Sequence, residues 1–338
     1  MVAPLRYNKC HLITVGIPRA LLYYQYQPMW RTFFEALGAE VVVSPPTTNA
    51  ILVTGASRVV AETCLPAKVF VGHALTLVKE CDYLFIPAVR SVQRKVYNCA
   101  KFLGLPDMIR AVIPEAPPIL DVEIDINRGK RDLYLAIYQL GRHFTWNPAK
   151  VRRAATLAWQ AHLDYRQLMS RNKLTPVQAI DNTPDNKLSA SDVSATIALI
   201  GHPYLLYDEH INHRLIHRLE QARCRVVTPE MLTAPELETA VNGMVGHAYW
   251  TYEEEVVGAG GHYLNSGVDG VIGVMAFGCG PDSLMMDMVR RQAASMKETP
   301  FMSLTLEEHT AATGIITRLE AFLDMLHRRK RRPVPLCV

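Results

Sequence analysis

The chain has 338 residues, of which 49% are hydrophobic and 20% are charged. This length suits two domains of ordinary size, and the composition is typical of a folded globular protein and excludes a disordered chain. The formal net charge of +4 is small, and much of it lies in the basic run from His327 to Arg332. We interpret that run as a solvated helix end, and we predict no nucleic-acid partner.

Short apolar runs rich in β-branched residues alternate with longer amphipathic stretches along the chain. This alternation is typical of βα units that build a parallel sheet. We predict an α/β fold with Rossmann-like, doubly wound and mainly parallel sheets. The predicted strands are residues 12–16, 40–44, 83–87, 196–201, 225–228, 270–277 and 300–306.

The two groups of strands begin with similar sequences, ITVGIPRALLYY in the first and ATIALIGHPYLLY in the second. Both read as a strand, then Gly-x-Pro, then Leu-Leu-Tyr, which indicates two domains related by internal duplication. Between them, a predicted helix at 148–171 is followed by a polar segment rich in Pro, Asn, Asp and Ser, which is typical of a linker. We therefore predict an N-terminal α/β domain at 1–147, a helical connector and linker at 148–192, and a C-terminal α/β domain at 193–338.

The N-terminal segment lacks the basic and apolar regions of a secretory signal, and no apolar run is long enough to span a bilayer. We therefore predict a cytoplasmic protein that does not bind membranes. The seven cysteines are an odd number without a pairing pattern. In a reducing compartment this favours packing, metal binding or catalysis over disulfides.

Three cysteines share one kind of position. Cys64 in ETCLPAK, Cys99 in YNCAKFLGLPD and Cys279 in AFGCGPDSL are each predicted to lie where a loop enters a helix. Free backbone N–H groups and the helix dipole at such positions favour negative charge, so we expect a lowered thiol pKa and a thiolate able to bind metal. The remaining cysteines are assigned to packing; they are Cys10, Cys81, Cys224 and Cys337.

Structural zinc sites usually contain close CxxC pairs, and this sequence has none. Three widely separated thiolates instead suit an iron-sulfur cluster with one iron open to another ligand or a substrate. Packing remains the alternative for all three, because free cysteine is among the most buried residue types.

Other polar residues follow predicted strands and are candidates for chemistry. Glu308 and His309 come directly after the strand at 300–306 and are predicted as acid–base groups, with helix capping as the alternative. Candidate residues for contact with a substrate or with the cluster ligands are Arg19, Tyr23, Lys68, Arg90, His202 and Tyr204. The sequence contains neither a Walker lysine motif nor a dinucleotide fingerprint, so no ATP site is predicted.

Four segments together resemble one family, the acyl-CoA dehydratase activase-related proteins. These are relatives of the large subunits of 2-hydroxyacyl-CoA dehydratases and benzoyl-CoA reductases. The resemblance runs from about Leu12 to Met325. The segments are ETCLPAK, YNCAKFLGLPD, NSGVDGVIGVMAFGCGPDSL and EEHTAATGIITRLEAF.

The resemblance implies a [4Fe-4S] cluster held between two Rossmann-like domains by Cys64, Cys99 and Cys279. It also implies a separate ATP-hydrolysing activase that donates electrons, and a small-molecule substrate, with a CoA thioester as the candidate. On this basis we predict the catalytic component of a dehydratase or reductase, within a homodimer or heterodimer. Two alternatives are a non-catalytic protein that carries a cluster for electron transfer and a metal-free protein that binds small molecules.

Overall fold

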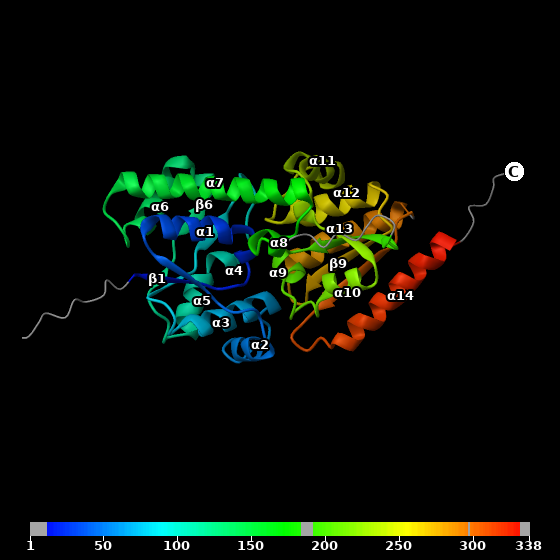
Figure 1. Ribbon diagram of the computed structural model, residues 1–338, viewed down its shortest axis with the longest axis horizontal. Coiled ribbons are helices and arrows are strands. Elements are labelled where there is room, and N and C mark those ends of the chain that lie inside the picture. The colour runs from blue at the N-terminus through cyan, green and yellow to red at the C-terminus, as the bar shows by residue number, and fades with distance from the viewer. Residues whose placement is uncertain (1–11, 184–191, 297, 332–338) are drawn as a thin grey trace, which may run out of the picture.

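Two four-stranded parallel sheets lie side by side, one in each half of the chain (Figure 1). The computed structural model describes residues 12–183, 192–296 and 298–331. All seven predicted strands are present, so the α/β prediction is confirmed as a mixed fold with parallel sheets. Within the described residues, no helix combines the length and apolar character needed to cross a membrane.

The first sheet has the strand order β2-β1-β3-β5. Its strands are β1 (Thr14–Ile17), β2 (Glu40–Val43), β3 (Tyr83–Phe85) and β5 (Ile119–Leu120). The helices of this half are α1 (Tyr23–Leu37), α2 (Asn49–Ala56), α3 (Leu65–Leu77), α4 (Ala100–Leu103) and α5 (Leu105–Val112). In a separate two-stranded sheet, β4 (Ala88–Ser91) pairs with β6 (Glu123–Asp125). The 3₁₀ helix η1 (Ile126–Arg128) comes directly after β6.

The second sheet has the order β10-β9-β7-β8. Its strands are β7 (Ala195–Gly201), β8 (Cys224–Val227), β9 (Gly270–Ala276) and β10 (Phe301–Leu306). Its helical elements are α9 (Pro203–Leu206), α10 (Leu215–Gln221), η3 (Pro229–Met231), α11 (Ala234–Val245), η4 (Glu254–Gly258), α12 (Ala259–Asn265), α13 (Gly280–Met296) and α14 (Ala312–Arg331).

The two sheets share one topology. In each sheet, the strand that comes first in the chain lies between the second and the third, and the fourth lies at the edge beyond the third. Ligands of such sheets bind at the carboxyl ends of the first and third strands, where the strand order reverses. The shared order agrees with internal duplication, which stays a prediction.

The connector contains more helix than the sequence analysis predicted. It comprises α7 (Pro148–Asn172) and α8 (Pro176–Ile180), while α6 (Lys130–Gly141) precedes it within the predicted N-terminal domain. The predicted helix at 148–171 is confirmed as α7, which lies along α1 (Figure 1). The segment predicted as a polar linker instead forms α8, because Thr175 and Gln178 make a reciprocal capping box. Residues 184–191 of the predicted linker, as well as Cys10 and Cys337, lie outside the described residues.

The two halves share a continuous apolar interior. Val15 of β1 and Ile197 of β7 belong to the same cluster of buried side chains. The hydroxyl of Tyr165, on α7, donates a hydrogen bond of 2.7 Å to the carbonyl of Tyr24 at the start of α1. The halves therefore pack directly on each other and on the connector.

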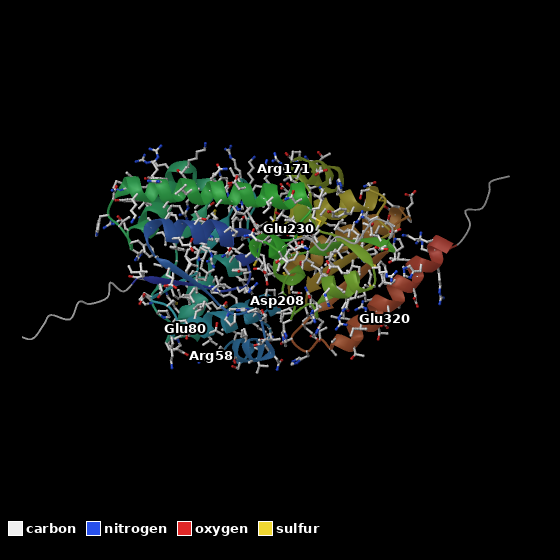
Figure 2. All side chains as sticks on the ribbon, in the orientation of Figure 1. Arg58, Glu80, Arg171, Asp208, Glu230 and Glu320 are labelled. Carbon is white, nitrogen blue, oxygen red and sulfur yellow. The ribbon has the colours of Figure 1, made fainter. Side chains whose placement is uncertain are left out.

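A buried chain of hydrogen bonds also crosses between the halves, through His73 of α3. Its Nδ1 lies 2.9 Å from the hydroxyl of Ser44, and its Nε2 lies 2.8 Å from the hydroxyl of Thr47. The hydroxyl of Thr47 donates a hydrogen bond to the carboxylate of Asp208, which belongs to the second half. Figure 2 labels Asp208 near the middle of the molecule. The Thr47 oxygen consequently accepts from Nε2–H, and Nδ1 accepts from Ser44, so a neutral imidazole completes the chain.

This buried position predicts a loss of stability in acid. Burial, followed by the nearby charge of Arg19, lowers the pKa of His73 to about 4. An unfolded histidine titrates near pH ~6.5, so between these values the unfolded chain binds more protons, and lowering the pH favours unfolding. From pH 7 to pH 5 we expect His73 to remove about 2 kcal/mol from the free energy of unfolding.

Urea denaturation of the wild type, His73→Gln and His247→Gln at both pH values measures this contribution. The decrease in the free energy of unfolding from pH 7 to pH 5 should be smaller in His73→Gln than in the wild type. In His247→Gln it should equal that of the wild type, since His247 is exposed. An equal fall in all three proteins would contradict the prediction.

Candidate functional site

Each of the three predicted cysteines lies at the N-terminus of a helix. Cys64 is the N-cap residue of α3, Cys99 is the N-cap residue of α4, and Cys279 directly precedes α13. The predicted positions are therefore confirmed. Cys224 is the first residue of β8 and Cys81 comes two residues before β3, so both lie near the amino ends of strands.

The three thiols gather in one place between the halves. Cys64 and Cys99 lie near enough to Cys279 for their ionised forms to raise its pKa, and Cys64 is near enough to Cys99 to do the same there. All three side chains are partly buried. The first half contributes two of these thiols and the second half contributes the third, so the site exists only when the halves are packed together.

Backbone pairing fixes the loop that carries Cys99. The N–H of Tyr97 donates to the carbonyl of Tyr249 at 2.9 Å, and the N–H of Thr251 donates to the carbonyl of Tyr97 at 3.0 Å. These bonds tie a loop of the first half to a loop of the second half, only two residues before Cys99. They hold this thiol against the half that supplies Cys279.

For Cys99 and Cys279, the expected lowering of the thiol pKa was wrong. Burial, followed by the carboxylate of Asp282, raises the pKa of Cys279 to about 12. Burial also raises the pKa of Cys99, although the backbone N–H groups of Lys101 and Phe102 act in the opposite direction. Desolvation of the thiolate outweighs the helix N-termini, so these two thiols are protonated at neutral pH unless a cation displaces their protons.

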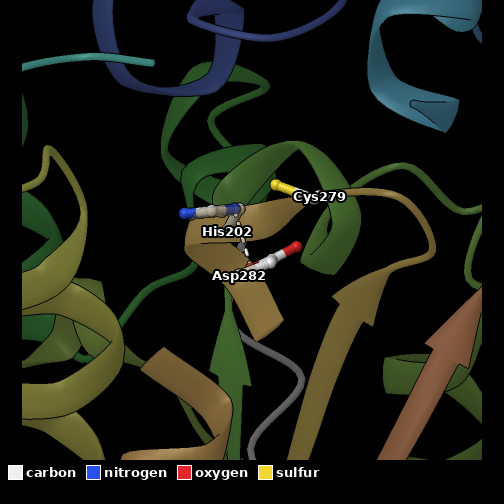
Figure 3. A group of neighbouring side chains, drawn as sticks. All are labelled: His202, Cys279 and Asp282. Atoms are coloured by element: carbon white, nitrogen blue, oxygen red, sulfur yellow. Dashed lines mark ion pairs between the residues drawn. The ribbon is translucent and has the colours of Figure 1, made fainter. Parts of the chain in front are cut away.

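A histidine and an aspartate lie beside Cys279 (Figure 3). The ligand atoms of His202, Cys279 and Asp282 all lie within 4.8 Å of one another. The Nδ1 atom of His202 is 2.9 Å from the carboxylate of Asp282 and 2.7 Å from the hydroxyl of Tyr204. The Nε2 atom is buried without a hydrogen-bond partner among the described residues.

Strand order explains why these residues meet. His202 follows β7 and Cys279 follows β9, and these adjacent strands flank the point where the order of the second sheet reverses. Asp282, which is fully buried, accepts a hydrogen bond of 2.9 Å from the N–H of Ala276 at the end of β9. This bond holds the turn that carries Cys279 against the strand.

The surroundings suit a metal centre bound by sulfur. The rings of Tyr204 and Tyr252 both contact His202, with centroids 5.0 Å from its ring, and both tyrosines are buried. Three thiols, an imidazole nitrogen without a partner, and an apolar aromatic wall fit an iron-sulfur cluster better than magnesium or calcium, which prefer oxygen ligands.

Glu308, predicted as an acid–base group, is held in an ion pair. It pairs with Lys68 of α3, which also donates a hydrogen bond of 2.8 Å to the carbonyl of Ala61. Partial burial opposes ionisation of Glu308, but the bond and charge of Lys68 hold its pKa below the usual value. His309 is exposed. The pair links the two halves, while the catalytic roles of Glu308 and His309 stay predictions.

Three further candidates lie in other surroundings. Arg19 and Tyr23 line an open cavity of about 910 Å³ whose lining includes none of the three cysteines, and the guanidinium of Arg19 lies 5.5 Å from the Tyr23 ring centroid. Arg90 of β4 pairs with Glu123 and Asp125 at 3.5 and 3.7 Å. His202 and Tyr204, in contrast, lie in the cysteine site.

Two residues of the site, Asp282 and Tyr252, were not predicted from the sequence. Asp282 stands three residues after Cys279 in the first turn of α13, where an acidic residue usually serves the helix dipole. Tyr252 lies in a loop with a positive φ of 72° that no periodicity predicts. Only the tertiary structure brings their side chains to the cysteine site.

Residues 14–232 match the family described as the CoA enzyme activase uncharacterised domain. The match covers more than half of the chain, so the chain belongs to this family. It includes Cys64 and Cys99 and ends before Cys279. No curated protein sequence matches the chain.

This match corrects the predicted function. The family description names an activase, so the prediction of a dehydratase or reductase catalytic component that takes electrons from an activase was wrong. That prediction rested on three cysteines and four motifs, and a cysteine set does not distinguish a protein that gives electrons from one that receives them. Membership of the dehydratase large-subunit superfamily stays a prediction.

The ion pair between Lys68 and Glu308 predicts a measurable stability difference. Lys68 is 2% exposed, so Glu308→Gln leaves a buried ammonium without its counter-charge. We expect a loss of about 2–4 kcal/mol in the free energy of unfolding. The neighbouring Glu307 is exposed. The control variant Glu307→Gln should therefore change the free energy of unfolding by about 0.5 kcal/mol or less. Equal urea midpoints for the two variants would contradict the prediction.

Proposed function

We propose that this member of the CoA enzyme activase domain family activates a CoA enzyme, and that it holds a [4Fe-4S] cluster on Cys64, Cys99 and Cys279. The family description supports the link to a CoA enzyme. The convergence of three thiols from both halves supports the cluster and is the observation that carries the proposal. When bound, such a cluster accepts and releases single electrons.

The residues around the thiols suit this role. The ammonium of Lys101 lies 3.4 Å from the sulfur of Cys64, and the N–H groups of Lys101 and Phe102 act on Cys99. Positive charge and N–H donors near the sulfur ligands stabilise the additional negative charge that a reduced cluster carries. Burial limits the access of water to the same atoms.

His202 is the candidate for a fourth protein ligand. Its Nδ1 is hydrogen-bonded to the hydroxyl of Tyr204 and lies 2.9 Å from the carboxylate of Asp282, and its Nε2 is buried without a hydrogen-bond partner among the described residues. Histidines that bind metals usually donate their other N–H to a carboxylate or carbonyl. A site with four protein ligands has no open iron for a substrate, and this suits electron transfer to another protein.

The proposed architecture is two Rossmann-like domains related by duplication, with the cluster between them. A CoA enzyme is the proposed electron-accepting partner. ATP hydrolysis is assigned to a separate protein or domain, because the sequence contains no Walker lysine motif. A location in the cytoplasm suits an oxygen-sensitive cluster and remains part of the proposal.

The first test is metal content after purification without oxygen. We expect about four irons and four sulfides per chain, and loss of both in Cys64→Ser, Cys99→Ser and Cys279→Ser. Cys224→Ser is the matched control, since Cys224 is buried at the start of β8. A wild-type chain that takes up no iron on reconstitution would overturn the cluster proposal.

The second test addresses His202. In the reduced protein, electron–nuclear double resonance should detect a strongly coupled ¹⁴N nucleus, because a ligating nitrogen shares the unpaired spin. His202→Ala should lose this coupling and retain iron on the three cysteines, and His309→Ala should keep both. A cluster with no ¹⁴N coupling in the wild type would exclude His202 as a ligand and leave the three thiolates in place.

A further inference from the structure

A second cavity, of about 390 Å³, lies in the first half of the molecule. Helices α1, α6 and α7 and the small β4–β6 sheet surround it. Its volume falls within the range of small-molecule sites, which are mostly apolar with a few polar groups. Its wall includes Tyr26, Met29, Trp30, Phe33, Ile137 and Trp159.

Two cations also line this cavity. Lys130 stands at the start of α6 and Arg166 lies on α7, and both are exposed. Neither forms an ion pair within 4 Å with any residue that the structure describes. Glu255 is near enough to Arg166 to interact with its charge, but burial raises the pKa of that carboxyl group. The lining therefore offers positive charge to an anionic ligand beside a large aromatic surface.

The wall contains one more polar group. His162 of α7 is 7% exposed, and its ring stacks against Tyr26 at 5.2 Å and lies 5.3 Å from the ring of Trp159. Its Nδ1 has no hydrogen-bond partner within the described part of the chain. Burial lowers the pKa of His162 to about 4, so the ring is neutral. Unpaired buried polar atoms are rare in native proteins, and one beside a cavity is consistent with a binding site.

We propose that this cavity binds a small carboxylic acid with an aromatic or branched apolar body. The apolar body packs against Trp30, Phe33 and Trp159, and the carboxylate pairs with Lys130 and Arg166. The positive charge of the lining selects an anionic ligand over a neutral molecule of the same shape.

The cavity lies close to the cysteine site. Tyr26, in its wall, interacts electrostatically with Tyr252, whose ring contacts His202. The binding proposal does not depend on the cluster, because its residues are separate from the three cysteines.

The test is calorimetric titration of the intact protein with 3-phenylpropionate, and with 3-phenylpropan-1-ol as the uncharged analogue. We expect the acid to bind more tightly than the alcohol. In the double variant Lys130→Ala, Arg166→Ala, affinity for the acid should fall about tenfold or more, with little change for the alcohol. Both residues are exposed, so folding should be preserved.

A filling variant tests the position. Ala155 lines the cavity, so Ala155→Trp should abolish binding of both probes. Leu157→Trp is the matched control on the same helix, since Leu157 is 45% exposed and lies outside the lining. Absence of acid binding to the wild type, or equal binding to the double variant, would overturn the proposal.

Discussion

The arrangement of the site depends on the fixed contact between the two halves of the chain. Cys64 and Cys99 come from the first half and Cys279 from the second, so a small rotation between the halves would separate the thiols. Interactions of different kinds oppose such a rotation: the backbone pairing at Tyr97, the ion pair of Lys68, and the hydrogen-bond chain through His73. Because these interactions lie at different places along the contact, together they fix the position of one half relative to the other.

Burial decides the chemistry of the thiols. A helix N-terminus alone favours a thiolate, but at Cys99 and Cys279 the cost of removing a charge from water is larger. Protonated, half-buried thiols are poor nucleophiles. The same thiols become good ligands once a metal replaces their protons, since the ion supplies the charge that the N–H groups and Lys101 only partly provide. This contrast favours metal binding over covalent catalysis.

The sequence predicted those parts of the structure that depend on local pattern. Long apolar strands such as β7 and β9, and the amphipathic helix α7, were found because their periodicity extends over many residues. The two-residue β5 and three-residue β6 are too short to produce a pattern. The helix α8 was not predicted because the Pro, Asn and Asp residues around it are typical of a linker, although Thr175 and Gln178 form a capping box.

The candidate site was likewise predictable from the sequence only in part. The three cysteines were identifiable because Gly and Pro mark a loop-to-helix turn at each of them or nearby. The raised pKa of Cys279 was not predictable, because it follows from burial and from Asp282, which only the tertiary structure reveals. The pairing of Glu308 with Lys68 joins residues far apart in the sequence, and no spacing rule predicts it.

The surroundings of the thiols also bear on which way electrons move. A catalytic component needs an open metal position beside a cavity for its substrate and a free acid–base group. Here Glu308 is engaged by Lys68, His309 is exposed, and the space beside Cys279 holds His202, Tyr204 and Tyr252. A site enclosed by side chains protects a bound centre from water and exchanges electrons through the protein. These surroundings support the proposed role in electron transfer more than a role in binding a substrate beside Cys279.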